Sequence, residues 1–337
     1  MTDVVTEVLI VAPAFLEWDL GTYISQILTA QKIAYEQFAY RGWADAATAN
    51  KALLEKAASC RPRYVIGLKM GLIEPETLAE LRRQGAILGL WHVDCFDDQV
   101  PAQIGRLLPH LDAFFVTAKG MIPAYAAVSD TPVHWLVEGV YLPAFPKVVV
   151  PEAQRPLYES QVAFVGNLLH PPVADKTLAQ RRLRLLAAIS ERHTLKIWGP
   201  QGDPSTDTVW DNRAPIIRWP AYHEELVKIC SSSEVVLGIN TINSVPQYFS
   251  NRTYLTLASG GFHLTHYVPR LEKMFINHGH LVWYHSNEEC LDLIDDYLKR
   301  PFARQKIAKA GQAWVREKYS MDLQVEKMLD VLASVRK

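Results

Sequence analysis

Apolar runs and amphipathic stretches alternate along the first half of the chain. Residues 8–15 form a continuous apolar run, and residues 20–32 follow with apolar positions at helical spacing, which predicts a strand, a loop and a helix. Further strand and helix pairs are predicted at 35–40 and 51–58, 64–68 and 75–83, 86–93 and 101–107, and 113–117 and 121–128, before a last strand at 133–136. Unbroken apolar strands are typical of a parallel sheet covered on both faces. The pattern predicts a doubly wound α/β domain.

A second alternation begins after a proline-rich stretch. Pro143, Pro146, Pro151 and Pro156 lie in a segment of little periodicity, which is typical of an interdomain linker. Beyond it, strands are predicted at 161–165, 195–198, 235–239, 262–265 and 280–284, and helices at 178–190, 222–230, 251–259, 288–298, 302–318 and 322–335. We therefore expect two Rossmann-like domains facing across a cleft, at 1–150 and 151–320. A C-terminal helix at 321–337 can cross back to the first domain.

Charge and cysteine content exclude several classes of function. Lys and Arg number 35 against 36 Asp and Glu, a net charge of −1, so no overall attraction to nucleic acid or anionic lipid is expected. The four cysteines are at least 35 residues apart and form no C-x-x-C pair, which indicates a reducing compartment and no cysteine zinc site. No apolar stretch reaches the roughly 18 residues of a membrane span. The sequence predicts a soluble cytoplasmic protein.

Several chemical signatures are absent from the sequence. No G-x-G-x-x-G follows the first strand, and no P-loop or G-x-S-x-G motif is present, which disfavours dinucleotide, NTPase and α/β-hydrolase chemistry. Two histidine pairs, His263 with His266 and His278 with His280, invite interpretation as metal ligands, but their strand-like context argues against it. They lack nearby carboxylate partners, so we interpret them as surface or cleft histidines and predict no metal site.

The segment 244–265 is the most informative part of the chain. Ser250 is a good N-cap for the predicted helix, which ends at Gly260 and Gly261 before the next strand. A helix start at the carboxyl edge of a sheet offers free N–H groups to an anion, and Arg252 in the first turn adds a charge that suits a diphosphate. The pattern is equally typical of a capped core helix with a surface arginine.

A resemblance to a known family bears on these alternatives. The C-terminal half contains FVGN at 164–167, Arg181 and Arg182, WGP at 198–200, YHEELVKICSSSEVVLGIN at 222–240 and SNRTYLTLASGGFHLT at 250–265. This order resembles the C-terminal half of GT-B glycosyltransferases, and most closely their spore-maturation (CgeB-like) group. In the first half, WHVDCFDD at 91–98 and LVEGVYLPAF at 136–145 resemble the same group more loosely.

The resemblance implies a sugar-nucleotide donor in the C-terminal domain and an acceptor that approaches from the N-terminal domain. The donor-binding positions it implies are Gly166 and Asn167 by the phosphates, Trp219 and Tyr222 by the base, Asn240, and Ser250, Asn251 and Arg252 on the diphosphate. Trp219 and Tyr222 are equally interpretable as interface aromatics, and Asn240 as a turn residue.

One position departs from the family pattern. Related retaining enzymes carry two glutamates separated by seven residues, the second of which contacts the ribose; Gln247 and Leu255 stand here instead. The missing carboxylate permits a deoxyribose donor such as a dTDP-sugar beside a UDP-sugar. It also leaves open a protein that binds a nucleotide or glycan without turnover.

The expected reaction is glycosyl transfer to an unidentified glycan, protein or small-molecule acceptor, without a bound metal or cofactor. His92 and Asp94, at a strand end in the first domain, are the candidates for acid, base or acceptor-orienting roles. Asp97 and Asp98 are interpreted as helix caps and Lys69 as a surface lysine. The alternatives are a non-catalytic nucleotide-sugar or glycan-binding protein and a sugar-nucleotide epimerase of the same architecture.

Overall fold

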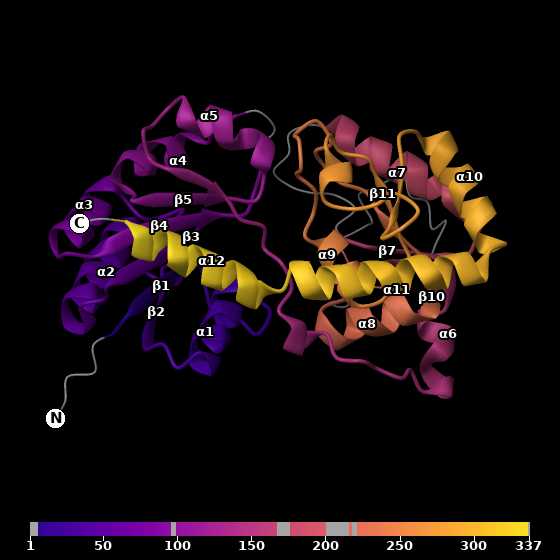
Figure 1. The fold of residues 1–337 in the computed structure, drawn as a ribbon, viewed down its shortest axis with the longest axis horizontal. Helices are drawn as coiled ribbons and strands as arrows, with labels where there is room; N and C mark the ends of the chain where they lie inside the picture. The colour runs from indigo at the N-terminus through magenta and orange to yellow at the C-terminus, as the bar shows by residue number, and fades with distance from the viewer. Residues whose placement is uncertain (1–5, 96–98, 167–175, 200–215, 218–220, 336–337) are drawn as a thin grey trace. The chain divides into compact units, whose positions relative to one another are not determined.

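The computed structural model describes residues 6–95, 99–166, 176–199, 216–217 and 221–335 (Figure 1). The chain divides into two compact units. Unit 1 comprises Met1–Gly139, Ser244–Tyr248 and Met321–Lys337, and unit 2 comprises Val140–Asn243 and Phe249–Ser320. The chain thus passes into unit 2 after Gly139, earlier than residue 150. Within the described residues, none of the helices is long and apolar enough to span a bilayer.

Unit 1 is built on a six-stranded parallel sheet in the order β2-β1-β3-β4-β5-β6. Its strands are β1 Val8–Ala12, β2 Tyr35–Ala39, β3 Tyr64–Leu68, β4 Ile87–His92, β5 Ala113–Val116 and β6 Val133–Trp135. Its helices are α1 Leu20–Ala30, α2 Ala46–Cys60, α3 Pro75–Arg83, α4 Ala102–Leu107, α5 Ile122–Ala126 and α12 Met321–Ser334. Every residue of β1, β3 and β4 is buried, as a parallel sheet covered on both faces requires.

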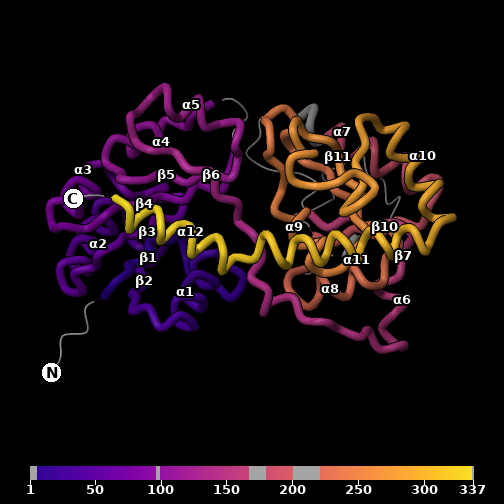
Figure 2. Tube along the Cα trace, in the orientation of Figure 1, coloured from indigo at the N-terminus to yellow at the C-terminus, as the bar shows by residue number. Residues whose placement is uncertain are grey.

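The last helix returns to the sheet of unit 1. Helix α12, yellow in the traces of Figures 1 and 2, packs on α1, β4 and β5. Gly89 in β4 makes room for it, because a Cβ there would lie 3.0 Å from the Leu332 side chain. The expected helix therefore forms and joins the sheet of the first unit.

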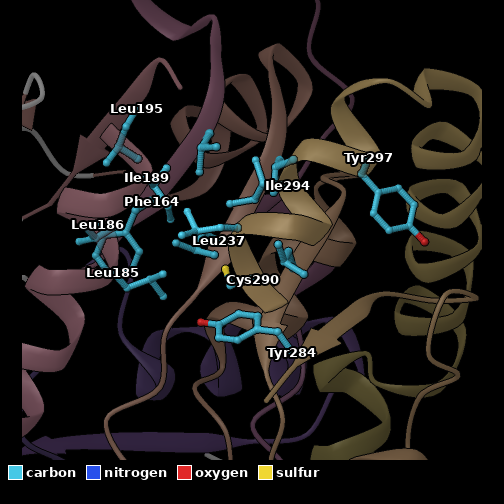
Figure 3. Packing of buried hydrophobic residues seen from close by; sticks show 14 of the residues in the cluster. Phe164, Leu185, Leu186, Ile189, Leu195, Leu237, Tyr284, Cys290, Ile294 and Tyr297 are labelled. Atoms are coloured by element: carbon cyan, nitrogen blue, oxygen red, sulfur yellow. The ribbon is translucent and has the colours of Figure 1, made fainter. Parts of the chain in front are cut away.

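Unit 2 holds a second six-stranded parallel sheet in the order β12-β11-β10-β7-β8-β9. Its strands are β7 Ser160–Val165, β8 Leu195–Trp198, β9 Ile216–Ile217, β10 Ser233–Gly238, β11 His263–His266 and β12 Val282–Tyr284. Its helices are α6 Arg155–Tyr158, α7 Lys176–Ser190, α8 His223–Ser232, α9 Arg252–Ala258, α10 Asn287–Leu298 and α11 Pro301–Lys318. Figure 3 shows its core, where Phe164, Leu186, Leu237 and Ile294 meet from two strands and two helices.

The predicted α/β class is confirmed, and some element boundaries differ for local reasons. Helix α2 begins five residues before the predicted start, because the Asp45 carboxylate accepts a hydrogen bond from the Thr48 N–H and caps it. The short helix α6 begins at the end of the proline-rich stretch, with Pro156 in its first turn. Strand β9 is only two residues long, and its sequence pattern is too short to predict.

Candidate functional site

The strand order of unit 2 creates a switch point between β7 and β10. The chain runs from β7 outward to β8 and β9, and then returns to the other side of β7 as β10. In open parallel sheets, ligands bind outside the carboxyl ends of the strands at such a point. Gly166 directly follows β7, and Asn240 lies two residues beyond β10. The topology thus brings two of the predicted donor-binding positions to the same edge.

Backbone segments approach closely at the ends of β7 and β8. The Gly166 N–H donates a hydrogen bond of 2.9 Å to the Trp198 carbonyl. Gly199 has a φ of +144°, and a Cβ at this position would overlap the Gly166 carbonyl oxygen. A glycine is therefore required in the WGP segment. The neighbouring prediction, Asn167, lies outside the described residues.

Asn240 presents a buried amide at this edge. Its side chain is 8% exposed, and its Oδ1 accepts a hydrogen bond of 3.1 Å from the Ser250 N–H. A backbone N–H can only donate, so this bond fixes which end of the amide is the oxygen. The Nδ2 donor then has no partner among the described residues. An unmet buried donor costs about 1 to 3 kcal/mol, which an anionic ligand oxygen would recover.

Helix α9 begins one residue later than the sequence suggested. The predicted N-cap, Ser250, is wrong: Asn251 is the N-cap, and its backbone is already helical, with φ −56° and ψ −18°. The Ser250 hydroxyl still contributes, since it accepts a hydrogen bond of 3.3 Å from the Arg252 N–H. With seven residues, α9 is too short for its dipole to carry an anion site, so the charge of Arg252 is the stronger feature.

Arg252 is a partly buried cation. Burial is the main cause that lowers its pKa, while Tyr222 and Cys230 act in the opposite direction. Among the described residues, no carboxylate lies within 4.0 Å of its guanidinium. The half-exposed Tyr222, at the N-cap of α8, belongs to the same neighbourhood. Trp219 lies outside the described residues.

A second arginine, missed among the predicted site residues, lies at the same edge. Arg182 of α7 is buried and donates hydrogen bonds of 3.1 Å to the Ile239 carbonyl and 3.2 Å to the Thr241 hydroxyl. Burial is the main cause that lowers its pKa, and repulsion from Arg252 adds to the effect. The two guanidiniums and the Asn240 amide together form a cationic, donor-rich corner that suits a diphosphate.

His263 anchors α9 to the sheet. The interpretation of this residue as a surface or cleft histidine is wrong, because its side chain is 1% exposed. Its Nδ1 lies 3.0 Å from the Val236 carbonyl oxygen, which can only accept, so Nδ1 carries the proton and donates. In the neutral ring Nε2 is then an acceptor, and it accepts a hydrogen bond of 3.1 Å from the Thr253 hydroxyl. Burial lowers its pKa to about 4 and keeps it neutral. Thr253 adjoins Arg252, so this bond holds the start of α9.

The predicted acceptor-side residues meet at the carboxyl ends of β3 and β4 in unit 1. The Lys69 ammonium and the Asp94 carboxylate form an ion pair at 2.7 Å, with both side chains 43% exposed. The interpretation of Lys69 as a surface lysine is therefore incomplete, because its ammonium is paired with the Asp94 carboxylate. His92 is 5% exposed, and burial lowers its pKa to about 4. Asp94 is the accessible member of the predicted pair; Asp97 and Asp98 lie outside the described residues.

The segment Ser244–Tyr248 also belongs to unit 1. The Gly120 N–H donates a hydrogen bond of 2.9 Å to the Pro246 carbonyl. Tyr248 accepts a hydrogen bond from the Cys95 N–H, and burial raises its pKa. Gln247, at the first of the two glutamate positions, is buried with a left-handed φ of +53°. The sequence pattern does not predict that residues 244–248 belong to unit 1.

Comparison with known proteins shows what this chain resembles. Residues 181–330 match a family model described as glycosyl transferase-like. No curated protein matches the chain. Several solved structures share the fold over nearly all of both chains, and the architecture is that of the GT-B glycosyltransferases. The predicted GT-B fold is therefore confirmed, whereas the CgeB-like subgroup is not.

Three of these solved structures are described here with their sequence identity, coverage and TM-score. Sucrose-phosphate synthase from Thermosynechococcus elongatus is 14% identical, covers 97% of this chain and 98% of its own, and gives a TM-score of 0.68. Anabaena HepE in complex with UDP-glucose is 11% identical, with coverage of 97% and 99% and a TM-score of 0.69. A Listeria monocytogenes protein assigned as a UDP-N-acetylglucosamine 2-epimerase is 14% identical, with coverage of 98% and 96% and a TM-score of 0.62.

Proposed function

We propose that this protein is a glycosyltransferase that moves a sugar from a nucleotide-sugar donor to an acceptor hydroxyl. The observation that carries the proposal is the corner made by Arg182, Arg252 and the buried Asn240 amide at the carboxyl edge of unit 2. The family match over residues 181–330 and the UDP-glucose complex of Anabaena HepE support the same chemistry. We place the donor diphosphate at this corner.

The proposed chemistry follows from the charges of these side chains. Departure of a nucleoside diphosphate leaves negative charge on its terminal phosphate, and preorganised cations and donors stabilise that charge. Arg252 supplies a charged guanidinium, while the Asn240 amide is fixed by its bond to the Ser250 N–H. These groups provide the electrophilic assistance without a bound metal in our proposal. Gly166, Asn167, Trp219, Tyr222, Ser250 and Asn251 complete the proposed donor site.

A panel of sugar nucleotides tests the proposal. The protein is incubated with UDP-, GDP- and dTDP-sugars, with and without cell lysate as a source of acceptor, and released nucleoside diphosphate is measured. Release that requires lysate supports transfer. Conversion of one free sugar nucleotide into another would identify an epimerase instead, and binding without release under every condition would identify a non-catalytic binding protein.

We propose that the accessible Asp94 acts on the acceptor directly and that the buried His92 has an acceptor-orienting role beside it. We expect Asp94→Asn and His92→Gln to lower the rate of transfer by 10²- to 10⁴-fold, roughly the contribution of general acid–base groups. The dissociation constant of the nucleoside diphosphate should stay unchanged, because these residues lie in unit 1. Calorimetry beside single-turnover kinetics separates the two effects. Loss of diphosphate binding in both variants would contradict an acceptor-side role.

Leu255 bears on the choice of nucleotide. The Leu255 side chain is partly buried, and it stands at the position of α9 where the related enzymes carry a glutamate. A ribose hydroxyl pair would lose an acceptor worth about 1 to 3 kcal/mol, so dTDP should bind at least as tightly as UDP. Dissociation constants measured side by side test this prediction. A tenfold preference for UDP, about 1.4 kcal/mol, would show that other groups recognise the ribose.

A further inference from the structure

Large exposed apolar side chains lie on three neighbouring loops at one edge of unit 1. Leu16 (51% exposed) and Trp18 (43%) follow β1, Trp43 (43%) follows β2, and Leu72 (38%) follows β3. The sheet order β2-β1-β3 makes these three loops neighbours. With strands about 4.8 Å apart, the three strand ends span about 10 Å. We name these four residues the apolar edge.

Hydrogen bonds tie the three loops together. The Tyr40 N–H donates to the Ala12 carbonyl at 2.9 Å, and the Arg41 N–H donates to the Pro13 carbonyl at 3.1 Å, which joins the loop after β2 to the loop after β1. The Tyr40 hydroxyl accepts a hydrogen bond of 3.4 Å from the Gly71 N–H, which joins it to the loop after β3. The apolar edge therefore rests on one connected set of loops.

The Trp43 side chain of the apolar edge is held in place. The Trp43 indole N–H donates to the Ala39 carbonyl at 2.9 Å, and its ring stacks on Phe38 with centroids 5.8 Å apart. The backbone of Leu72 is fixed as well, because its carbonyl accepts a hydrogen bond of 2.8 Å from the Asn50 amide. Fixed apolar groups bind a ligand at a lower entropic cost than mobile ones.

The apolar edge adjoins the ion pair of Lys69 and Asp94. Lys69 and Leu72 belong to the same loop after β3, in which Lys69 and Met70 both have left-handed backbones, with φ of 61° and 51°. Such a conformation is unfavourable for a residue that is not glycine, and it persists where the surroundings enforce it. This turn directs Lys69 to Asp94 and leaves Leu72 exposed.

The size of the apolar edge indicates a small ligand. A large side chain has about 150 to 250 Å² of surface, so four side chains at these exposures offer on the order of 300 to 400 Å². A stable protein interface buries about 800 Å² on each partner. The apolar edge therefore fits one acyl or aryl group better than a second copy of the chain.

We propose that the apolar edge binds an acyl or aryl group of the acceptor, whose hydroxyl is presented to Asp94. This inference rests on the proposed glycosyl transfer. It limits the acceptor to an amphipathic molecule, because a fully polar acceptor would leave the two leucines and two tryptophans in water.

Alkyl glycosides test the proposal in the absence of donor. By calorimetry, n-octyl β-D-glucoside below its critical micelle concentration should bind at least tenfold more tightly than methyl β-D-glucoside. Leu16→Asp and Leu72→Asp should each weaken octyl glucoside binding at least fivefold. The matched control is Val128→Asp, a residue of unit 1 that is 51% exposed after α5, and it should bind like wild type.

Three results would overturn the proposal. They are equal affinities for the two glucosides, an equal loss in Val128→Asp, and a wild-type dimer in sedimentation that Leu72→Asp dissociates. Failure of the proposed function is a separate result: no nucleoside diphosphate would bind or be released, whatever the alkyl glucosides do. Binding of UDP and dTDP to the same variants separates the two outcomes.

Discussion

Replacement of Arg252 by alanine should weaken nucleoside diphosphate binding ten- to hundredfold. The guanidinium is partly buried beside Arg182, and no described carboxylate within 4.0 Å offsets its charge. A charge-assisted hydrogen bond to a diphosphate is worth about 1.5 to 3 kcal/mol, which corresponds to this loss. Arg252→Lys keeps the charge but loses the two-pronged geometry, so it should fall between wild type and alanine.

The matched control is Arg184→Ala. Arg184 is an exposed arginine on α7, the helix that also carries the buried Arg182. Its removal should leave the affinity within twofold of wild type. Circular dichroism melting checks that both variants fold. An Arg252→Ala protein that melts like wild type and binds the diphosphate equally well would remove this residue from the donor site.

Much of the fold follows from the apolar pattern alone. Strands such as Val8–Ala12 and Tyr64–Leu68 are apolar at nearly every position, and only a sheet buried on both faces accommodates that composition. The register of the parallel strands then places their carboxyl ends at one edge. The pattern places Arg252 at a helix start beside the carboxyl edge of a sheet, whereas the assignment of Gly166 and Asn240 to the donor site is what the family resemblance implies.

Other features of the site depend on tertiary contacts that no local pattern encodes. Arg182 reaches the Ile239 carbonyl, 57 residues further along the chain, and helical periodicity marks it only as one of several arginines. His263 begins the strand β11, whose sequence HLTH shows no clear apolar face, so whether the ring is buried depends on α9, which packs over it. The Lys69 ion pair depends on two left-handed residues, and non-glycine side chains at such positions are not predictable from propensity.

Acid should destabilise both units between pH 6.5 and pH 4. His92 in unit 1 and His263 in unit 2 are buried, and burial lowers the pKa of each to about 4. In the unfolded chain their pKa is about 6.5, so the unfolded state binds more protons in this range and stability falls as the pH is lowered. A shift of this size corresponds to about 3 kcal/mol per histidine, reached near pH 4.

Glutamine at position 263 isolates one of these contributions. His263→Gln keeps a donor for the Val236 carbonyl and an acceptor for the Thr253 hydroxyl, but it does not titrate. We expect it to lose about 1 to 3 kcal/mol of stability at pH 7, because its bonds are less well placed in a packed site. Between pH 6.5 and 4, its stability should then decrease less steeply than that of wild type.

Urea unfolding at a series of pH values measures these slopes. Because the chain has two compact units, each transition is fitted separately, and only the transition of unit 2 should respond to His263→Gln. A wild-type slope in that variant would mean that His263 does not stay neutral in the folded protein. The hydrogen bond from the Thr253 hydroxyl to Nε2 would then have to be reversed, with the ring donating at both nitrogens. The start of α9 would in that case carry a third positive charge close to Arg252, and diphosphate affinity would rise as the pH fell.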